Sequence, residues 1–178
     1  MNDKVLKQGI RYGLIGGILF LVINYGAWAS GNTNTFVTAR TLNGFIPYII
    51  VMLIIAGLAL RKSNGNVLSF QQALKFAFLA YIIVALTEAI GNYILFNWID
   101  HNLTAKVFEI TKAKALKMMQ ALGSSDSNIE DRLNQKSADT NQTTLKNVVL
   151  GLGLDLVWYF CKALLIALVI RKEEKFTD

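Results

Sequence analysis

Four long apolar runs constrain the fold of this chain more than any other feature. A bilayer core about 30 Å thick is crossed by roughly 20 apolar residues in a helix, and lipid forces the backbone groups to pair within that helix. Runs of sufficient length occupy residues 12–29, 42–60, 76–98 and 148–170. They predict an all-α fold, an integral membrane bundle of four transmembrane helices, in which residues 1–178 form a single membrane domain.

The composition agrees with a membrane protein and argues against other classes. Hydrophobic residues make up 53% of the chain and charged residues 17%, whereas soluble domains are nearer a quarter charged. Lys and Arg bordering the apolar runs explain the net charge of +6, so the expected partner is the lipid bilayer and not a nucleic acid. The lone Cys161 excludes an intrachain disulfide. The lone His101, with only Asp100 beside it, offers too few ligands for a metal, and no cofactor is expected.

Basic residues indicate how the chain is threaded. Those near the ends of the runs are Lys4, Lys7, Arg11, Arg61, Lys62, Lys75, Arg171, Lys172 and Lys175. The short loop predicted between the first two runs holds only Arg40. Since Lys and Arg accumulate on the cytoplasmic side, both termini are expected in the cytoplasm. Seven Lys or Arg residues between the third and fourth runs argue the other way, although acidic residues accompany them.

The amino-terminal run has two interpretations. Basic residues, an apolar core and the tripeptide at 27–29, Ala-Trp-Ala, imitate a cleaved secretory signal. Gly9, Gly13 and Gly17 recur at every fourth residue, a spacing typical of a helix that packs closely against another membrane helix. This spacing favours an uncleaved first helix with the three glycines in a helix contact.

Two local signals concern the second and third helices. Pro47 falls in the first turns of the second run, where a proline is tolerated. Ser69, followed three residues later by Gln72, predicts a capping box at the start of the third helix.

A helical extramembrane insert is expected at residues 99–146, between the third and fourth runs. Apolar positions across 102–122 predict an amphipathic helix that ends at Gly123. Ser127 and Glu130 predict the capping box of a second, shorter helix. The insert either packs on the bundle or serves as a docking surface for a partner protein.

Three stretches resemble a known family. They are "GIRYGLIGGIL" near the start, "LSFQQALKFAFL" at the third helix and "GSSDSNIEDRL" in the insert. Together with the order of the elements, they are similar to the bacterial membrane proteins grouped as the domain of unknown function 4199 family. The resemblance covers nearly the whole chain. It implies a four-helix protein of the bacterial inner membrane with an uncleaved first helix, and it carries no activity over to any residue.

Charged side chains inside the third and fourth runs need partners. A charge at the bilayer centre costs about 2.5–3.5 kcal/mol on an insertion scale, so it should face protein or water. At the helical rise, Asp155 and Glu88 lie about 10 and 12 Å below the outer surface, and Lys162 lies about 9 Å further in. The Lys162 side chain leans towards the amino terminus of its helix and hence towards both carboxylates.

These positions predict one intramembrane polar cluster. Asn92 lies one turn from Glu88, and Asn24 lies in the outer half of the first helix. The predicted members are therefore Glu88, Asp155, Lys162, Asn92 and Asn24. Because two carboxylates face one ammonium, one carboxylate is expected to keep its proton.

The sequence leaves three classes of function to compare. The first is a small structural or accessory bundle that assembles as a homo-oligomer or with a partner membrane protein, its buried charges only aligning the helices. The second is a proton- or ion-coupled transporter or channel that uses the polar cluster, although the first two runs hold no matching charges and so no inverted repeat. The third, an enzyme, is not expected, because no nucleophile elbow, phosphate-binding glycine loop or metal-ligand spacing occurs. No catalytic residue is predicted.

Overall fold

The computed structural model describes residues 2–45, 47–121 and 145–173, and all its regular elements there are helices. They are α1 Asn2–Ala29, α2 Thr33–Phe45, α3 Tyr48–Ser63, α4 Phe70–Ile94, the π-helical turn η1 Leu95–Ile99, α5 Leu103–Ala121 and α7 Leu145–Ile170. Four stretches are long and apolar enough to cross a membrane: Asp3–Ala29, Thr33–Ser63, Phe70–Ile99 and Val148–Ile170. The predicted all-α fold class is confirmed.

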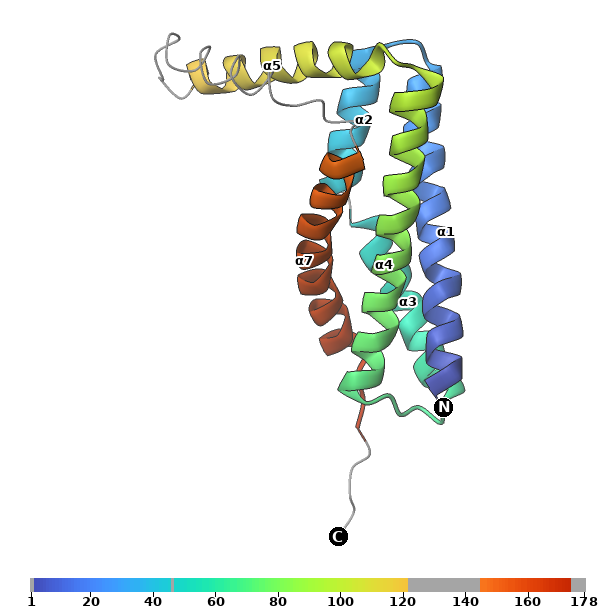
Figure 1. Cartoon of the computed structure of the whole chain (residues 1–178). Coiled ribbons are helices and arrows are strands. Elements are labelled where there is room, and N and C mark those ends of the chain that lie inside the picture. The colour runs from blue at the N-terminus through green and yellow to red at the C-terminus, as the bar shows by residue number, and fades with distance from the viewer. Residues whose placement is uncertain (1, 46, 122–144, 174–178) are drawn as a thin grey trace.

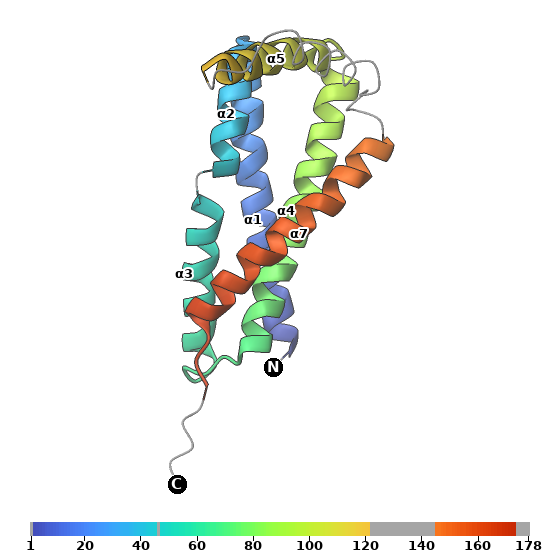
Figure 2. The same cartoon turned by 90° about the vertical axis from the view of Figure 1, so that its left-hand side faces the viewer.

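The helices that cross the membrane run side by side, and α5 lies across one end of them (Figure 1). We call this the α5 end. The opposite end, where α1 begins and α7 ends, is the termini end. In the perpendicular view α7 is oblique: it lies beside α3 at the termini end and leans away from α2 towards the α5 end (Figure 2). The α4 helix is central, since it packs against both α1 and α7.

The second crossing differs from the sequence-based prediction. Instead of a single run at 42–60, α2 begins at Thr33 and ends at Phe45, and α3 begins at Tyr48. Pro47 precedes α3 as its N-cap, so its effect is larger than predicted. A proline lacks an N–H and disfavours helical backbone in the residue before it, which ends α2. The prediction that Arg40 lies in a loop is wrong, because this residue lies within α2.

The half of the bundle next to the termini end, which we call the termini half, holds the main hydrophobic core. Its fully buried side chains are Leu53, Leu68, Ala73, Phe76, Ala77, Ala80, Ala163, Ile166, Ala167 and Ile170. The alanines come from α4 and α7, and small residues of this kind let membrane helices approach closely. This half is therefore closed by apolar contacts between α1, α3, α4 and α7.

Polar contacts also stabilise the termini half, at the end of the bundle that lies away from α5. Leu68 and Lys172 exchange two backbone hydrogen bonds of 2.8 and 2.9 Å, which tie the end of α7 to the start of α4. The predicted capping box is confirmed: Gln72 N–H donates to the Ser69 hydroxyl at 3.4 Å, and Ser69 N–H donates to the Gln72 side chain at 3.3 Å.

The insert is described only in its first part. The amphipathic helix predicted at 102–122 is confirmed as α5. The predicted stop at Gly123 and the capping box of Ser127 and Glu130 lie outside the described residues.

Candidate functional site

A cavity of about 180 Å³ lies beneath α5, between α2, α4 and α7. Charged side chains of α2, α4 and α7 line it: Glu88 is half-buried, and Arg40 and Asp155 are exposed. Its polar lining residues are Arg40, Glu88, Asn92, Tyr93, Asn97, Thr104 and Asp155. Apolar side chains of α4, α5 and α7 complete the wall.

One wall is formed by α2, which the sequence positions through a helix cap. The Asn32 side chain accepts from the N–H groups of Asn34 and Thr35 at 2.9 and 3.2 Å and so starts the helix. Two turns later Arg40 lines the cavity, with its guanidinium carbon 5.5 Å from the centre of the Phe96 ring. The aromatic face holds the cation in place.

The opposite wall carries both carboxylates. Glu88 on α4 accepts a 3.0 Å hydrogen bond from the Tyr159 hydroxyl of α7. Asp155, one turn before Tyr159 on the same helix, is exposed and lines the cavity. Asn92, one turn from Glu88, adds an amide to this wall.

The three charges of the cavity influence one another without touching. Arg40 interacts electrostatically with both Glu88 and Asp155. Within the part of the chain that the structure describes, the only ion pair joins Lys106 and Asp100, so the Arg40 guanidinium does not reach ion-pair distance of either carboxylate. The cavity thus keeps opposite charges on opposite walls, separated by open space.

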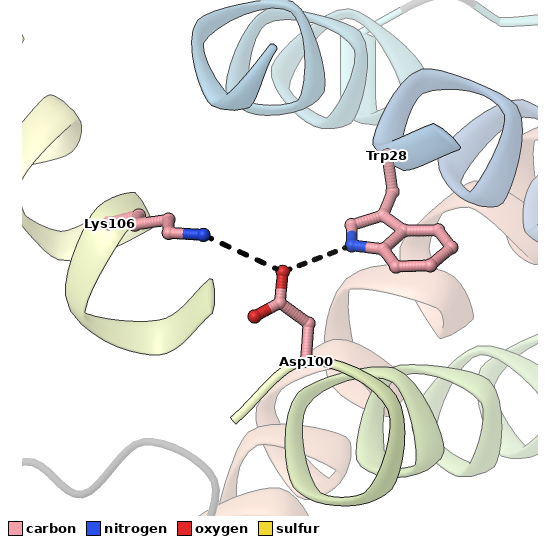
Figure 3. Close-up of polar contacts among 3 residues, drawn as sticks. All are labelled: Trp28, Asp100 and Lys106. Atoms are coloured by element: carbon pink, nitrogen blue, oxygen red, sulfur yellow. Dashed lines mark hydrogen bonds and ion pairs between the residues drawn. The ribbon is translucent and has the colours of Figure 1, made fainter. Parts of the chain in front are cut away.

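The roof is α5, which is tied to the rest of the bundle at its first turn (Figure 3). Asp100 Oδ2 accepts a 3.2 Å hydrogen bond from Trp28 Nε1 at the end of α1 and lies 4.0 Å from Lys106 Nζ of α5. Further along α5, Lys114 Nζ donates to the Thr38 hydroxyl of α2 at 3.1 Å. These contacts hold α5 against α2 and the ends of α1 and η1.

A contact between two tyrosine rings links the cavity to the termini half. The Tyr159 ring stacks on the Tyr81 ring, with centroids 4.9 Å apart and planes 13° from parallel. Tyr81 is 1% exposed and belongs to the main hydrophobic core. Tyr159 therefore joins the polar cavity, through its hydroxyl, to the apolar core, through its ring.

The structure places the five residues of the predicted polar cluster in three settings. Glu88, Asp155 and Asn92 line the cavity. Lys162 interacts electrostatically with both carboxylates, but its ammonium lies over the rings of Trp158 and Tyr159, at 5.6 and 5.3 Å from their centres.

Asn24 lies apart from the other four. It is buried on α1, does not line the cavity, and donates at 3.2 Å to the Phe20 carbonyl of its own helix.

The glycines predicted for a helix contact lie between α1 and α4. A Cβ atom added at Gly9 would stand 3.1 Å from the Phe76 carbonyl oxygen, and one at Gly13 would stand 2.7 Å from that of Ala80. At Gly17 it would stand 2.7 Å from Thr87. The two helices approach so closely here that larger side chains do not fit.

Sequence reading misses several residues of the site: Tyr93, Asn97 and Thr104 in the lining, and above all Arg40 and Tyr159. Arg40 is missed because the residues before Pro47 read as a loop, although the Asn32 cap is a signal for a helix there. Tyr159 is missed because an aromatic residue in an apolar run has no polar pattern around it. The hydroxyl partner of Glu88 becomes visible only once α4 and α7 are packed.

The chemistry available in the cavity is binding by charge and hydrogen bonds. No group of three or more His, Cys, Asp or Glu that could hold a metal ion occurs in residues 2–45, 47–121 and 145–173. The guanidinium of Arg40 suits an anionic group, and the carboxylates of Glu88 and Asp155 suit a cationic one.

Comparison with protein families gives a match over most of the chain. A family model described as Protein of unknown function (DUF4199) matches residues 11–172. No curated protein and no solved structure matches the chain.

Proposed function

The chain belongs to the family of proteins of unknown function DUF4199, and from this premise we propose that it is an accessory protein of the bacterial inner membrane. In this proposal the bundle holds a small polar ligand in its cavity at the α5 end and moves nothing through the membrane. It acts by assembling with a second copy or with another membrane protein.

The observation that carries the proposal is the contrast between an open and a closed half. The cavity occupies the α5 half, where α7 leans away from α2 (Figure 2). The termini half is filled by side chains such as Phe76, Ile166 and Ile170, each 0% exposed. A cavity in one half of the bundle, next to a half that is filled by buried apolar side chains, supports binding, whereas transport needs access from both sides.

The proposed orientation puts the α5 end outside and both termini in the cytoplasm. Lys4, Arg61 and Lys62 lie near the termini end, which the positive-inside rule assigns to the cytoplasm. The cavity then faces the outside of the cell. The lysines of α5 are attributed to the surface of the outer leaflet, where they remain in water.

The proposal assigns no reaction to the bundle. The described residues that line the cavity include no serine, cysteine or histidine. Thr104 is the one aliphatic hydroxyl of the lining, and its oxygen has no hydrogen-bond partner among the described residues. A nucleophile would need a general base within reach.

A proton- or ion-coupled transporter is the second candidate. It is favoured by Lys162, which lies one to two turns along α7 from Asp155 and acts electrostatically on Glu88 and Asp155 without forming an ion pair with either. Such groups could pass a charge from the cavity towards the core, provided that the termini half opened.

Reconstitution in vesicles separates the two candidates. Full-length protein in liposomes is expected to raise proton and ion flux no further than protein-free liposomes do. Lys162→Met and Glu88→Gln, singly and together, are then compared for abundance. The accessory function predicts loss of abundance in the single variants and recovery in the double variant. Flux that disappears in these variants while abundance holds would establish transport instead.

The oligomeric state completes this test. Size measurement in nanodiscs at several protein-to-lipid ratios reports whether the bundle pairs with itself. A dimer supports assembly as a homo-oligomer, and a monomer directs the search to a different membrane protein.

A further inference from the structure

The separated charges of the cavity are only partly satisfied by contacts among the described residues: Glu88 accepts from Tyr159, and Arg40 lies over the Phe96 ring. Arg40 has five N–H donors, and none of them forms a hydrogen bond or ion pair within the described part of the chain. The Asp155 carboxylate and the Asn92 amide likewise have no side-chain hydrogen-bond partner there. Charges at membrane depth are costly without partners, so water or a ligand must satisfy these groups.

The distribution of charge defines what such a ligand must carry. A simple anion would meet Arg40 but also two carboxylates, and a simple cation would meet the carboxylates but also Arg40. A metal ion would find only two carboxylates, with no third His, Cys, Asp or Glu ligand among the described residues. A molecule with a positive group at one end and a negative group at the other satisfies both walls.

The cavity has the size and donors for such a molecule. Its volume of about 180 Å³ exceeds the roughly 10–15 Å³ that one water needs. Glu88 already accepts from Tyr159, which orients its carboxylate on the α4 wall. The Arg40 guanidinium of α2 lies over the Phe96 ring of η1. The two charged walls are therefore fixed before a ligand arrives, which reduces the entropic cost of binding.

We propose that the cavity binds a small zwitterion, in which a primary ammonium group faces Glu88 and Asp155 and an anionic group faces Arg40. This inference rests on the proposed function, and it names the ligand class of the same cavity. An ammonium group donates three hydrogen bonds, and a phosphate or carboxylate accepts two from a guanidinium.

Two sources offer this chemistry. One is the headgroup of a membrane lipid, an ethanolamine phosphate. The lipid-facing surface of α7 beside the cavity carries Leu150 and Leu154, exposed by 59% and 76%, against which acyl chains can lie. The other source is a free zwitterion, such as an amino acid or phosphoethanolamine, from the water at the α5 end.

Binding measurements on the full-length protein distinguish the sources. Native mass spectrometry and thermal shift are carried out in detergent with phosphatidylethanolamine, phosphatidylcholine and phosphatidylglycerol. Isothermal calorimetry is carried out with phosphoethanolamine and alanine. Preference for phosphatidylethanolamine over the other two lipids supports a lipid headgroup. Binding of phosphoethanolamine or alanine supports a free ligand. Equal binding of all three lipids with no binding of the soluble probes overturns the proposal.

Substitutions locate the binding in the cavity. Arg40→Gln and Asp155→Asn are expected to weaken binding of the preferred probe by about tenfold or more, since each removes a charge-assisted hydrogen bond. Arg40→Lys keeps the charge and should restore part of the affinity. Lys117→Gln and Glu109→Gln on the exposed surface of α5 are matched controls with unchanged affinity. Unchanged binding in the cavity variants would overturn the proposal, even where the wild type binds.

The two proposals fail in different ways. Absence of zwitterion binding, with no flux in liposomes, removes the ligand class and leaves the accessory function standing. Flux that depends on Glu88 removes the accessory function, whatever the cavity binds.

Discussion

The same two helices, α4 and α7, pack closely in one half of this bundle and line a cavity in the other half. At the termini end α4 and α7 are joined through alanines and other apolar side chains. At the α5 end the same two helices carry Glu88 and Asp155, α7 leans away from α2, and a cavity remains (Figure 2). The difference shows that small residues let the helices pack closely in one half, whereas the charged residues of the other half line a cavity.

The break at Pro47 lies between the two halves. The α3 helix belongs to the closed half, where Leu53 is 0% exposed. The α2 helix belongs to the open half and carries Arg40. The interruption makes α2 a separate helix, and its Arg40 lines the cavity together with Glu88 and Asp155.

The largest effect on stability is expected when a large buried side chain is removed from the termini half. Phe76→Ala removes a fully buried ring and should lower the free energy of unfolding by about 3–5 kcal/mol. Leu154→Ala, at a side chain 76% exposed on α7, is the control and should change it little. Denaturation with sodium dodecyl sulfate in mixed micelles measures both. Equal losses in the two variants would contradict a closed termini half.

The next effect tests the close approach of α1 and α4. Gly13→Val places a Cβ 2.7 Å from the Ala80 carbonyl oxygen, so backbone must move, at a cost of about 1–3 kcal/mol. Gly26→Val lies in the same helix with no atom within 4 Å of the added Cβ. Thermal unfolding of the purified variants should show a lower midpoint for the first only. A stable Gly13→Val protein would mean that α1 does not contact α4 as described.

A smaller effect is expected at the boundary between the halves. Tyr159→Phe removes the hydrogen bond to Glu88 but keeps the ring on Tyr81, so the loss in stability should be about 1.5 kcal/mol. Tyr25→Phe removes a 2.8 Å hydrogen bond to the Gly91 carbonyl. It is the comparison in which the acceptor carries no charge. The same denaturation assay applies. A greater loss for Tyr25→Phe than for Tyr159→Phe would argue against a charged partner at Glu88.

The smallest effects on stability are expected when one helix cap is removed from each half. Ser69→Ala and Asn32→Ala each remove a capping side chain worth about 1 kcal/mol. Hydrogen exchange should become faster around Ser69 at the start of α4 in the first variant, and in α2 around Arg40 in the second. Asn32→Ser keeps a capping oxygen and should preserve slow exchange. Spread of either change to the whole bundle would show that the halves are not separable.

The spans were predictable because the length of an apolar run is a direct physical requirement of the bilayer. The start of α1 was not predictable in this way. The helix begins at Asn2, ten residues before the predicted run, because Lys4, Lys7 and Arg11 extend it beyond the apolar part. Such residues are good helix formers and place their charges in the headgroup region. Hydropathy therefore finds the membrane part of a helix and not its ends.

The site was predictable only in part. The depths of Glu88 and Asp155 follow from helical rise, and both line the cavity. The orientation of a side chain around the helix axis does not follow from depth, and Lys162 lies over two aromatic rings of its own helix without an ion pair to either carboxylate. The positive charge that lines the cavity is Arg40, which depends on how α2 packs.

Solvent access to the two halves tests the central claim most directly. In a Cys161→Ser background, single cysteines replace Gly151, which lines the cavity, and Ala163, which is 0% exposed in the core. A membrane-impermeant thiol reagent is applied from each side of oriented vesicles. We expect labelling of Gly151→Cys from the α5 side alone and of Ala163→Cys from neither side. Labelling of Ala163→Cys, or of Gly151→Cys from the termini side, would contradict a cavity in one half of the bundle next to a half that is filled by buried apolar side chains.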